Sequence, residues 1–156
     1  MAHYCWLAAT LLFWPALSVA QQAQDPLCLS LQTFLDSVQP GQVHEVAFHT
    51  VWGSNFNDSQ EPAVFAKRCK HDGYQPAKPV CESLMATGVI EFAGNNAKRV
   101  VACLSSETHL AQRLNLNSAS FFLSYGKEDQ GSSVTVQFTE DLQLGGKVLR
   151  ISANGY

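Results

Sequence analysis

The sequence lacks the short motifs that mark common catalytic, metal and phosphate sites. It has no Gly-x-Ser-x-Gly nucleophile turn, no His-Glu-x-x-His zinc motif and no Cys-x-x-Cys pair. A glycine-rich phosphate loop is also missing, because the only adjacent glycines, Gly145-Gly146, lie between two strand-like segments. These absences point to no catalytic residue and no cofactor, and they favour binding over turnover.

Charged residues are scarce, and no long basic run occurs. Asp, Glu, Lys and Arg make up 15% of the 156 residues, and the net charge is -3. The densest basic stretch, Lys67-Arg68-Cys69-Lys70-His71, is short, and we interpret it as the solvated face of a helix. Nucleic-acid binding normally needs a broad basic surface that displaces counterions. We therefore expect no nucleic-acid partner.

Long apolar runs are confined to the beginning of the chain. Leu7 to Leu17 is apolar, and Ser18-Val19-Ala20 then places small residues before polar Gln21-Gln22. This layout is typical of a secretory signal that is cleaved after Ala20. An uncleaved anchor, the alternative, is disfavoured because a membrane span takes about 20 apolar residues. We expect a signal peptide over 1–20 and a single periplasmic or secreted domain over 21–156, with no membrane span after cleavage.

Four of the five cysteines follow the expected cleavage site. In an oxidising compartment, Cys28, Cys69, Cys81 and Cys103 predict two disulfides, for which three pairings exist. Cys69 and Cys81 lie near the facing ends of two consecutive expected helices, so we favour Cys69–Cys81 with Cys28–Cys103. The alternative is a metal site of Cys69, His71, Cys81 and Cys103. Its Cys-Lys-His spacing is not the usual gap of a structural zinc site, and we expect no metal.

Apolar residues at helical spacing predict four helices in the first two thirds of the chain. Asp25-Pro26 opens the first, which continues to Val38. The second follows Asp58 or Ser59, carries Val64, Phe65 and Cys69 and ends near Gly73. A third runs from Pro79 to Gly88, and Asn95 or Asn96 caps a fourth that extends to Leu104. The short segment Val89 to Phe92 fits a strand or a helix equally well.

The remaining elements are expected to be strands. Val43 to Trp52 reads as a strand whose even-numbered residues face the core. Ser120 to Tyr125, Ser133 to Leu144 and Lys147 to Ala153 are also β-like. A two-residue turn at Gly145-Gly146 would pair Leu142 with Leu149 and place Asp141 opposite Arg150. The predicted fold is therefore α+β, with a helical amino-terminal half packed on a carboxy-terminal antiparallel β-meander and two disulfides.

Two aromatic residues near connections are the candidate binding residues. Trp52, Phe56 and Tyr74 all lie at or near connections and are aromatic, as binding hot spots often are, and we expect the recognition surface to include Trp52 or Tyr74. His44 and His49 are five apart on one strand, so they should point to opposite faces and share no ligand. Asn57-Asp58-Ser59 is a formal glycosylation acceptor in a predicted loop, relevant only in a eukaryotic source.

The favoured function is non-catalytic recognition outside the cytoplasm, with another protein as the partner. An inhibitor or toxin-neutralising protein would suit the size, the expected export and the missing catalytic motifs. One alternative is a small exported hydrolase whose site is assembled from scattered His, Asp, Glu and Ser residues. Another is a structural subunit of an envelope assembly. A pocket that gathers a histidine with carboxylates would favour the hydrolase, whereas an aromatic patch without such a pocket would favour recognition.

Overall fold

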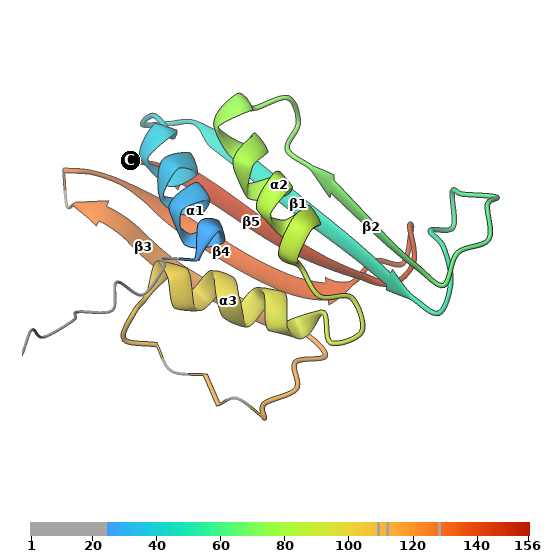
Figure 1. Ribbon diagram of the computed structural model, residues 1–156. Coiled ribbons are helices and arrows are strands. Elements are labelled where there is room, and N and C mark those ends of the chain that lie inside the picture. The colour runs from blue at the N-terminus through green and yellow to red at the C-terminus, as the bar shows by residue number, and fades with distance from the viewer. Residues whose placement is uncertain (1–24, 109, 112, 128) are drawn as a thin grey trace, which may run out of the picture.

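The chain folds into three α-helices and a five-stranded antiparallel sheet, so it belongs to the α+β class. The computed structural model describes residues 25–108, 110–111, 113–127 and 129–156; the predicted signal peptide and His109 lie outside them. Figure 1 labels the elements, which are α1 (Pro26–Ser37), β1 (Val43–Trp52), β2 (Phe65–Lys70), α2 (Lys78–Thr87), α3 (Gly94–Leu104), β3 (Ala119–Lys127), β4 (Gln130–Glu140) and β5 (Lys147–Gly155). None of the helices in this described part is long and apolar enough to cross a membrane.

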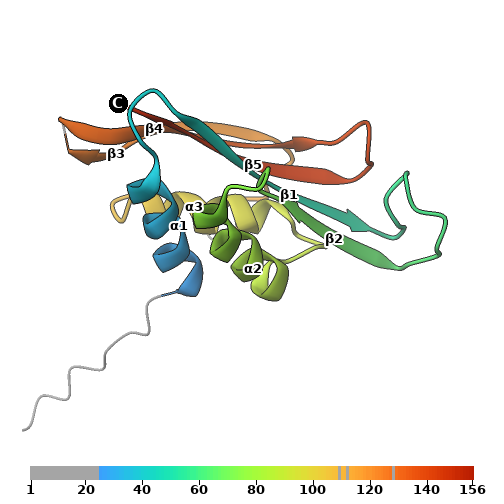
Figure 2. The same cartoon turned by 90° about the horizontal axis from the view of Figure 1, so that it is seen from above.

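All three helices cover one face of the sheet (Figure 2). The strand order is β2-β1-β5-β4-β3, so the β3–β4–β5 meander is extended by the β1–β2 hairpin. Even-numbered residues of β1, such as Val46 and Phe48, are buried against the helices, as the sequence predicted. The odd-numbered residues, including Glu45 and His49, point to the opposite face of the sheet, which we call the open face.

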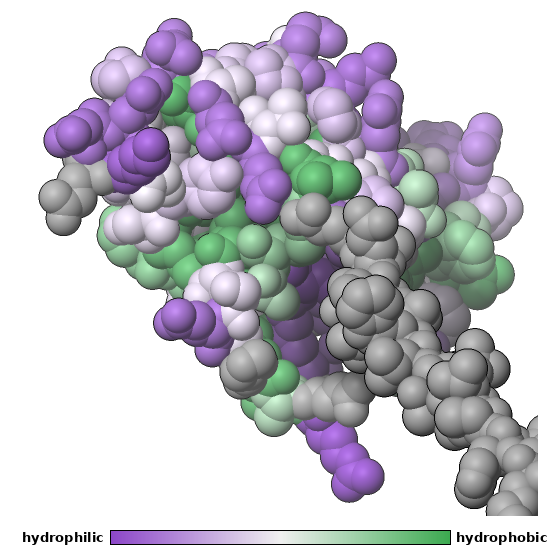
Figure 3. Space-filling model, turned by 60° about the vertical axis from the view of Figure 1, so that its left-hand side comes forward, coloured by the Kyte–Doolittle hydropathy of each residue, from purple (hydrophilic) through white to green (hydrophobic). Residues whose placement is uncertain are grey.

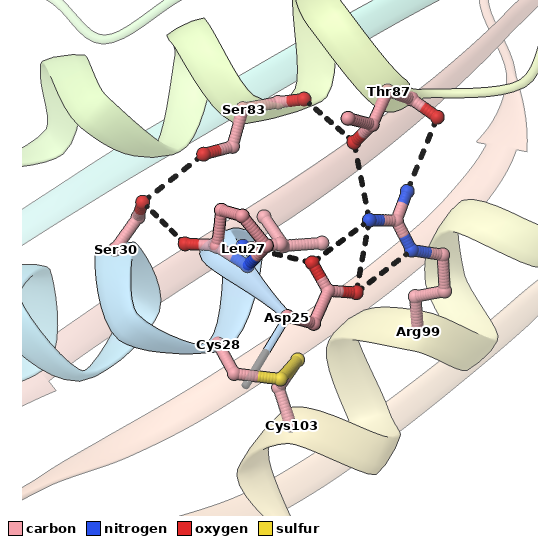
Figure 4. Close-up of a disulfide and its surroundings, with 9 residues drawn as sticks. Asp25, Leu27, Cys28, Ser30, Ser83, Thr87, Arg99 and Cys103 are labelled. Carbon is pink, nitrogen blue, oxygen red and sulfur yellow. Dashed lines mark hydrogen bonds and ion pairs between the residues drawn. A yellow bond between two sulfur atoms is a disulfide. The ribbon is translucent and has the colours of Figure 1, made fainter. Parts of the chain in front are cut away.

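Helix α1 supplies much of the core because its apolar residues recur at helical spacing. Leu27, Leu31 and Phe34 are completely buried and pack in one cluster with residues of the sheet. The helix begins where Asp25 accepts a hydrogen bond from the Leu27 amide at 3.0 Å, with Pro26 in the first turn. The same carboxylate pairs with Arg99 of α3 at 2.9 Å (Figure 4).

The two disulfides have the predicted pairing. Cys28–Cys103 ties α1 to α3, and Cys69–Cys81 ties β2 to α2. In Figure 4 the first bridge lies beside the Asp25–Arg99 ion pair, so a covalent and an ionic link join the same two helices. The metal-site alternative is wrong, because all three of its cysteines are in disulfides and none remains as a free thiolate ligand.

The segment predicted as the second helix is instead the edge strand β2. Phe65 pairs with Trp52, and Cys69 pairs with Phe48, in an antiparallel ladder with β1. Tertiary structure overrides the weak helical spacing here, because β2 covers an edge of β1 that would otherwise have unpaired backbone groups. The basic stretch therefore lies on a sheet edge and not on a helix.

The connection between α2 and α3 is irregular and is held by a side chain. Val89 to Phe92 forms neither a strand nor a helix. Helix α3 has Ala93 as its N-cap, with no side-chain cap hydrogen bond, so the predicted asparagine cap is wrong. The side chain of Asn96 instead accepts a hydrogen bond from the Val89 amide at 2.9 Å and donates one to the Val89 carbonyl at 2.7 Å. Asn96 thereby fixes the shape of this connection.

The predicted β4–β5 register is wrong by four residues. Glu140 pairs with Lys147, and Phe138 rather than Leu142 lies opposite Leu149. The connection is a loop over residues 141–146, because the Asp141 carboxylate accepts hydrogen bonds from the amides of Gln143 and Leu144 and stops the strand early. A shift of four keeps each residue on its predicted face, so the apolar face remains correct. Leu142 leaves the sheet and is 90% exposed.

The core is less completely covered near β3, the edge strand at the other side of the sheet. The face shown in Figure 3 carries an apolar band between hydrophilic regions. Several apolar residues of β3 and of the α3–β3 connection are only partly buried against the core, namely Leu110, Leu116, Phe121, Leu123 and Tyr125. On the open face of the same strand, Phe122 is 76% exposed.

Candidate functional site

A cleft lies at the end of the sheet where β1 ends and β5 begins. We call it the aromatic cleft. It has a volume of about 560 Å³. Its lining includes Trp52, Glu91, Phe92, Leu116, Asn117, Phe138, Glu140, Lys147 and part of the β4–β5 loop. Apolar and polar groups line this cleft in similar proportion, and it is large enough to hold a side chain of a partner or a small ligand.

Aromatic residues remain exposed at this cleft because the helices do not reach the end of the sheet. Trp52 is the last residue of β1 and lies on the helix-facing side, yet it is 55% exposed. Its cross-strand neighbour Phe65 is also exposed. Phe92, from the α2–α3 connection, is 56% exposed at the cleft. Large exposed apolar side chains gathered at one place indicate an interaction surface.

The charged residues of the cleft are mainly acidic. Glu91 and Glu140 are on its wall with Lys147. The Lys147 ammonium lies 3.1 Å from the Glu140 carboxylate and donates to the Asn117 carbonyl at 3.1 Å. No cation among the described residues forms an ion pair with Glu91. The cleft therefore has an uncompensated carboxylate beside two aromatic rings.

A second, smaller hollow lies on the open face of the sheet. We call it the polar pocket. It has a volume of about 210 Å³. It is lined by Glu45, Ala47, His49, Lys70, Asp72, Asp141, Gln143, Leu144 and Arg150. Arg150 pairs with Glu45 at 3.0 Å, so two of the charges neutralise each other.

His49 is the buried titratable group of the polar pocket. It is 3% exposed, and its Nδ1 atom lies 2.9 Å from Oδ2 of Asp141. Nδ1 is not aligned for a hydrogen bond with the carboxylate, so the contact is mainly electrostatic. Burial lowers the pKa of His49 below its ordinary 6.5; Asp141 opposes this effect, and the positive charges of Lys70 and Arg150 add to it. His49 is therefore neutral at neutral pH.

Asp141 belongs to both hollows, because the β4–β5 loop separates them. Burial acts to raise the pKa of Asp141. Hydrogen bonds from the amides of Leu144 and Gln143, together with the nearby His49, outweigh burial and hold the pKa below its ordinary value. The ionised carboxylate thus fixes the loop that forms one wall of each hollow.

The β1–β2 loop supports this wall from the open face. The Asn57 amide donates to the Leu144 carbonyl at 2.8 Å, and the Asn57 side chain donates to the Gln143 carbonyl at 3.1 Å. The asparagine of the glycosylation motif is thus engaged within the fold. Beside it, Phe56 is buried, and the guanidinium of Arg68 lies 4.5 Å from the centre of its ring.

The structure separates the two predicted binding residues. Trp52 lines the aromatic cleft, whereas Tyr74 lies outside it. The Tyr74 ring stacks on His44 with 3.5 Å between ring centroids, and its hydroxyl donates to the Ser37 carbonyl at 2.9 Å. Tyr74 therefore holds the end of α1. His44 and His49 face opposite sides of the sheet, as predicted.

Sequence reasoning missed Glu91, Phe92 and the pairing of His49 with Asp141. Glu91 and Phe92 lie in the irregular connection, where no periodic pattern singles out a residue. His49 and Asp141 are far apart in sequence and meet only through the β1–β5 pairing and the loop that follows β4. Comparisons with known protein families, curated proteins and solved structures find no match to this chain.

Proposed function

We propose that this protein is an exported recognition protein that binds another protein through the aromatic cleft and the exposed residues around it. The observation that supports the proposal most strongly is the clustering of Trp52, Phe65 and Phe92 at one end of the sheet. Exposed tryptophan and phenylalanine provide large contact areas at a modest cost in side-chain entropy. The aromatic cleft, which Trp52 and Phe92 line, offers a place for a side chain of the partner.

The proposed export rests on two independent features. The first twenty residues have the layout of a cleavable secretory signal. Two disulfides are compatible with an extracellular or periplasmic protein. Amino-terminal sequencing of the exported protein tests the signal, and we expect a chain that begins at Gln21. Recovery of a membrane-bound chain that retains Leu7 to Leu17 would refute the cleavage.

The test of recognition compares two exposed aromatic residues. Trp52→Ala removes an aromatic side chain at the cleft, whereas Phe122→Ala removes one from the far edge strand and is the matched control. The parent protein is first used to capture partners from the native envelope or medium, and mass spectrometry identifies them. We expect Trp52→Ala to lose the partner and Phe122→Ala to retain it, with both variants folded by circular dichroism. Equal capture by the two variants would refute the proposed surface.

A hydrolase is the second candidate, because the polar pocket gathers His49 with Asp141 and Glu45. Neutral His49, with its proton on Nδ1 beside the carboxylate, would use the lone pair on Nε2 to accept a proton from attacking water. Among the described residues, no Ser, Thr or Cys lines the pocket, so water would be the nucleophile. Turnover that is lost in His49→Asn but retained in Trp52→Ala would support this function over recognition.

A further inference from the structure

We propose that the aromatic cleft accepts an arginine side chain of the partner protein. This inference rests on the proposed function and adds the chemical class of the group that is recognised. It follows from the combination of carboxylates and exposed aromatic rings in the cleft, and from an arginine elsewhere in this chain that is already held in the same way.

The charges of the cleft favour a cation. Three carboxylates line it, those of Glu91, Glu140 and Asp141, against the single ammonium of Lys147. Asp141 is occupied by backbone amides and His49, and Lys147 is occupied by Glu140 and the Asn117 carbonyl. Glu91 therefore remains as a carboxylate without an ion pair among the described residues. An anionic ligand would meet this charge and find no free cation in the cleft.

The aromatic residues favour a planar cation with an apolar stem. Trp52 and Phe92 both line the cleft and are both about half exposed. The face of an aromatic ring attracts a cation, and tryptophan does so most strongly. A guanidinium group can stack on such a ring and at the same time donate hydrogen bonds to a carboxylate. Arginine thus matches both features of the cleft with one side chain.

The chain contains an intramolecular example of this recognition. The guanidinium of Arg68 lies 4.5 Å from the centre of the Phe56 ring. The same group donates two hydrogen bonds to the Asp58 carboxylate, at 2.6 and 2.9 Å. In that arrangement a phenylalanine and a carboxylate from one loop hold an arginine side chain. The cleft presents the same two kinds of group, and no cation among the described residues forms an ion pair with its Glu91 carboxylate.

The test uses the intrinsic fluorescence of the exported protein. The expected cleavage removes Trp6 and Trp14, so Trp52 is then the only tryptophan, and its emission reports the cleft. The probes are N-acetyl-arginine amide and its neutral isostere N-acetyl-citrulline amide, titrated at low ionic strength. We expect the arginine probe to change the emission and to bind about fivefold more tightly than the citrulline probe, and added salt to weaken this difference.

Glu91→Gln provides the specific variant and Glu82→Gln the matched control. Glu82 is an exposed carboxylate on α2 that does not line the cleft. We expect Glu91→Gln to weaken binding of the arginine probe about fivefold and Glu82→Gln to leave it unchanged. The inference is overturned if the two probes bind equally, if neither changes the emission, or if Glu91→Gln binds like the parent.

Failure of this inference can be distinguished from failure of the proposed function. If Trp52→Ala loses the partner but the arginine probe does not bind, protein recognition at the cleft is retained and the arginine assignment is wrong. If the arginine probe binds but partner capture is the same in Trp52→Ala and the parent, the proposed recognition surface is wrong, and with it the assignment of the arginine to a partner protein.

Discussion

The Nδ1 atom of His49 lies 2.9 Å from the Asp141 carboxylate, and this contact joins strand β1 to the β4–β5 loop. His49 belongs to β1, and Asp141 directly follows β4. Both side chains are almost completely shielded from solvent. A titratable pair in this position makes the stability of the loop wall depend on pH.

Stability is expected to fall as the pH decreases below about 6.5. Burial lowers the pKa of His49 in the folded state, so the unfolded chain binds a proton at a higher pH than the folded chain does. This contribution of His49 to stability is fully present above the pKa of histidine in the unfolded chain. It is lost as the pH falls from that value towards the lower pKa of His49 in the folded state. Urea unfolding between pH 7.5 and 5 measures this loss. We expect His49→Gln to show a smaller decrease than the parent.

Asp141→Asn is the companion variant for the same pair. Removing the carboxylate removes the attraction that opposes burial, so the pKa of His49 should fall further. A pH titration that monitors the His49 ring by nuclear magnetic resonance measures this pKa directly. An unchanged or raised pKa in Asp141→Asn would contradict the assigned role of the pair.

The two adjacent glycines of the β4–β5 loop should differ in their tolerance of a side chain. Both have positive φ, +81° for Gly145 and +74° for Gly146, so alanine is strained at either position. A Cβ at Gly146 would also collide with the Thr50 carbonyl and with Val51, whereas the atoms nearest to a Cβ at Gly145 belong to the Asn57 side chain and are 3.1 Å or more away. We expect Gly146→Ala to lower the free energy of unfolding by about 1–3 kcal/mol more than Gly145→Ala. Denaturant titrations of both variants measure the difference, and equal losses would argue against the close approach of Gly146 to β1.

The longer disulfide loop should contribute more to stability. Cys28–Cys103 encloses a sequence separation of 75 residues, and Cys69–Cys81 encloses one of 12. In the chain-entropy model, these loops correspond to about 4.5 and about 3 kcal/mol. Double Cys→Ser variants, compared by guanidinium unfolding, are expected to rank in that order. The reverse order would mean that local packing of β2 on α2 outweighs the effect of loop length.

Local sequence signals were sufficient to predict the structure where a residue acts on its neighbours in the chain. Asp25-Pro26 begins α1 as predicted, because a cap and a proline in the first turn act within a few residues. The disulfide pairing was also predicted correctly, although the argument for it placed Cys69 on a helix and this residue lies on strand β2. In the β4–β5 connection, the glycine pair indicated a tight hairpin, but hydrogen bonds to the Asp141 side chain determine where the strand ends.

The candidate site was predictable only in part, because it depends on contacts that sequence does not display. Trp52 could be selected as an aromatic residue at the end of a strand, and it lines the cleft. Tyr74 had the same attributes, yet its ring and hydroxyl are engaged by His44 and Ser37. Its place away from the cleft becomes visible only when the partners of each aromatic residue are known.

The shared wall between the aromatic cleft and the polar pocket restricts how this protein can diversify. Residues 141–146 form a partition that faces a different hollow on each side. A change in the length of this segment would alter the shape of both hollows together. Phe92 lies in the α2–α3 connection, which borders the aromatic cleft and not the polar pocket. Substitutions at this rim can therefore change the binding specificity of the cleft without altering the polar pocket. Related sequences should keep the length of the partition constant and vary most freely around Phe92.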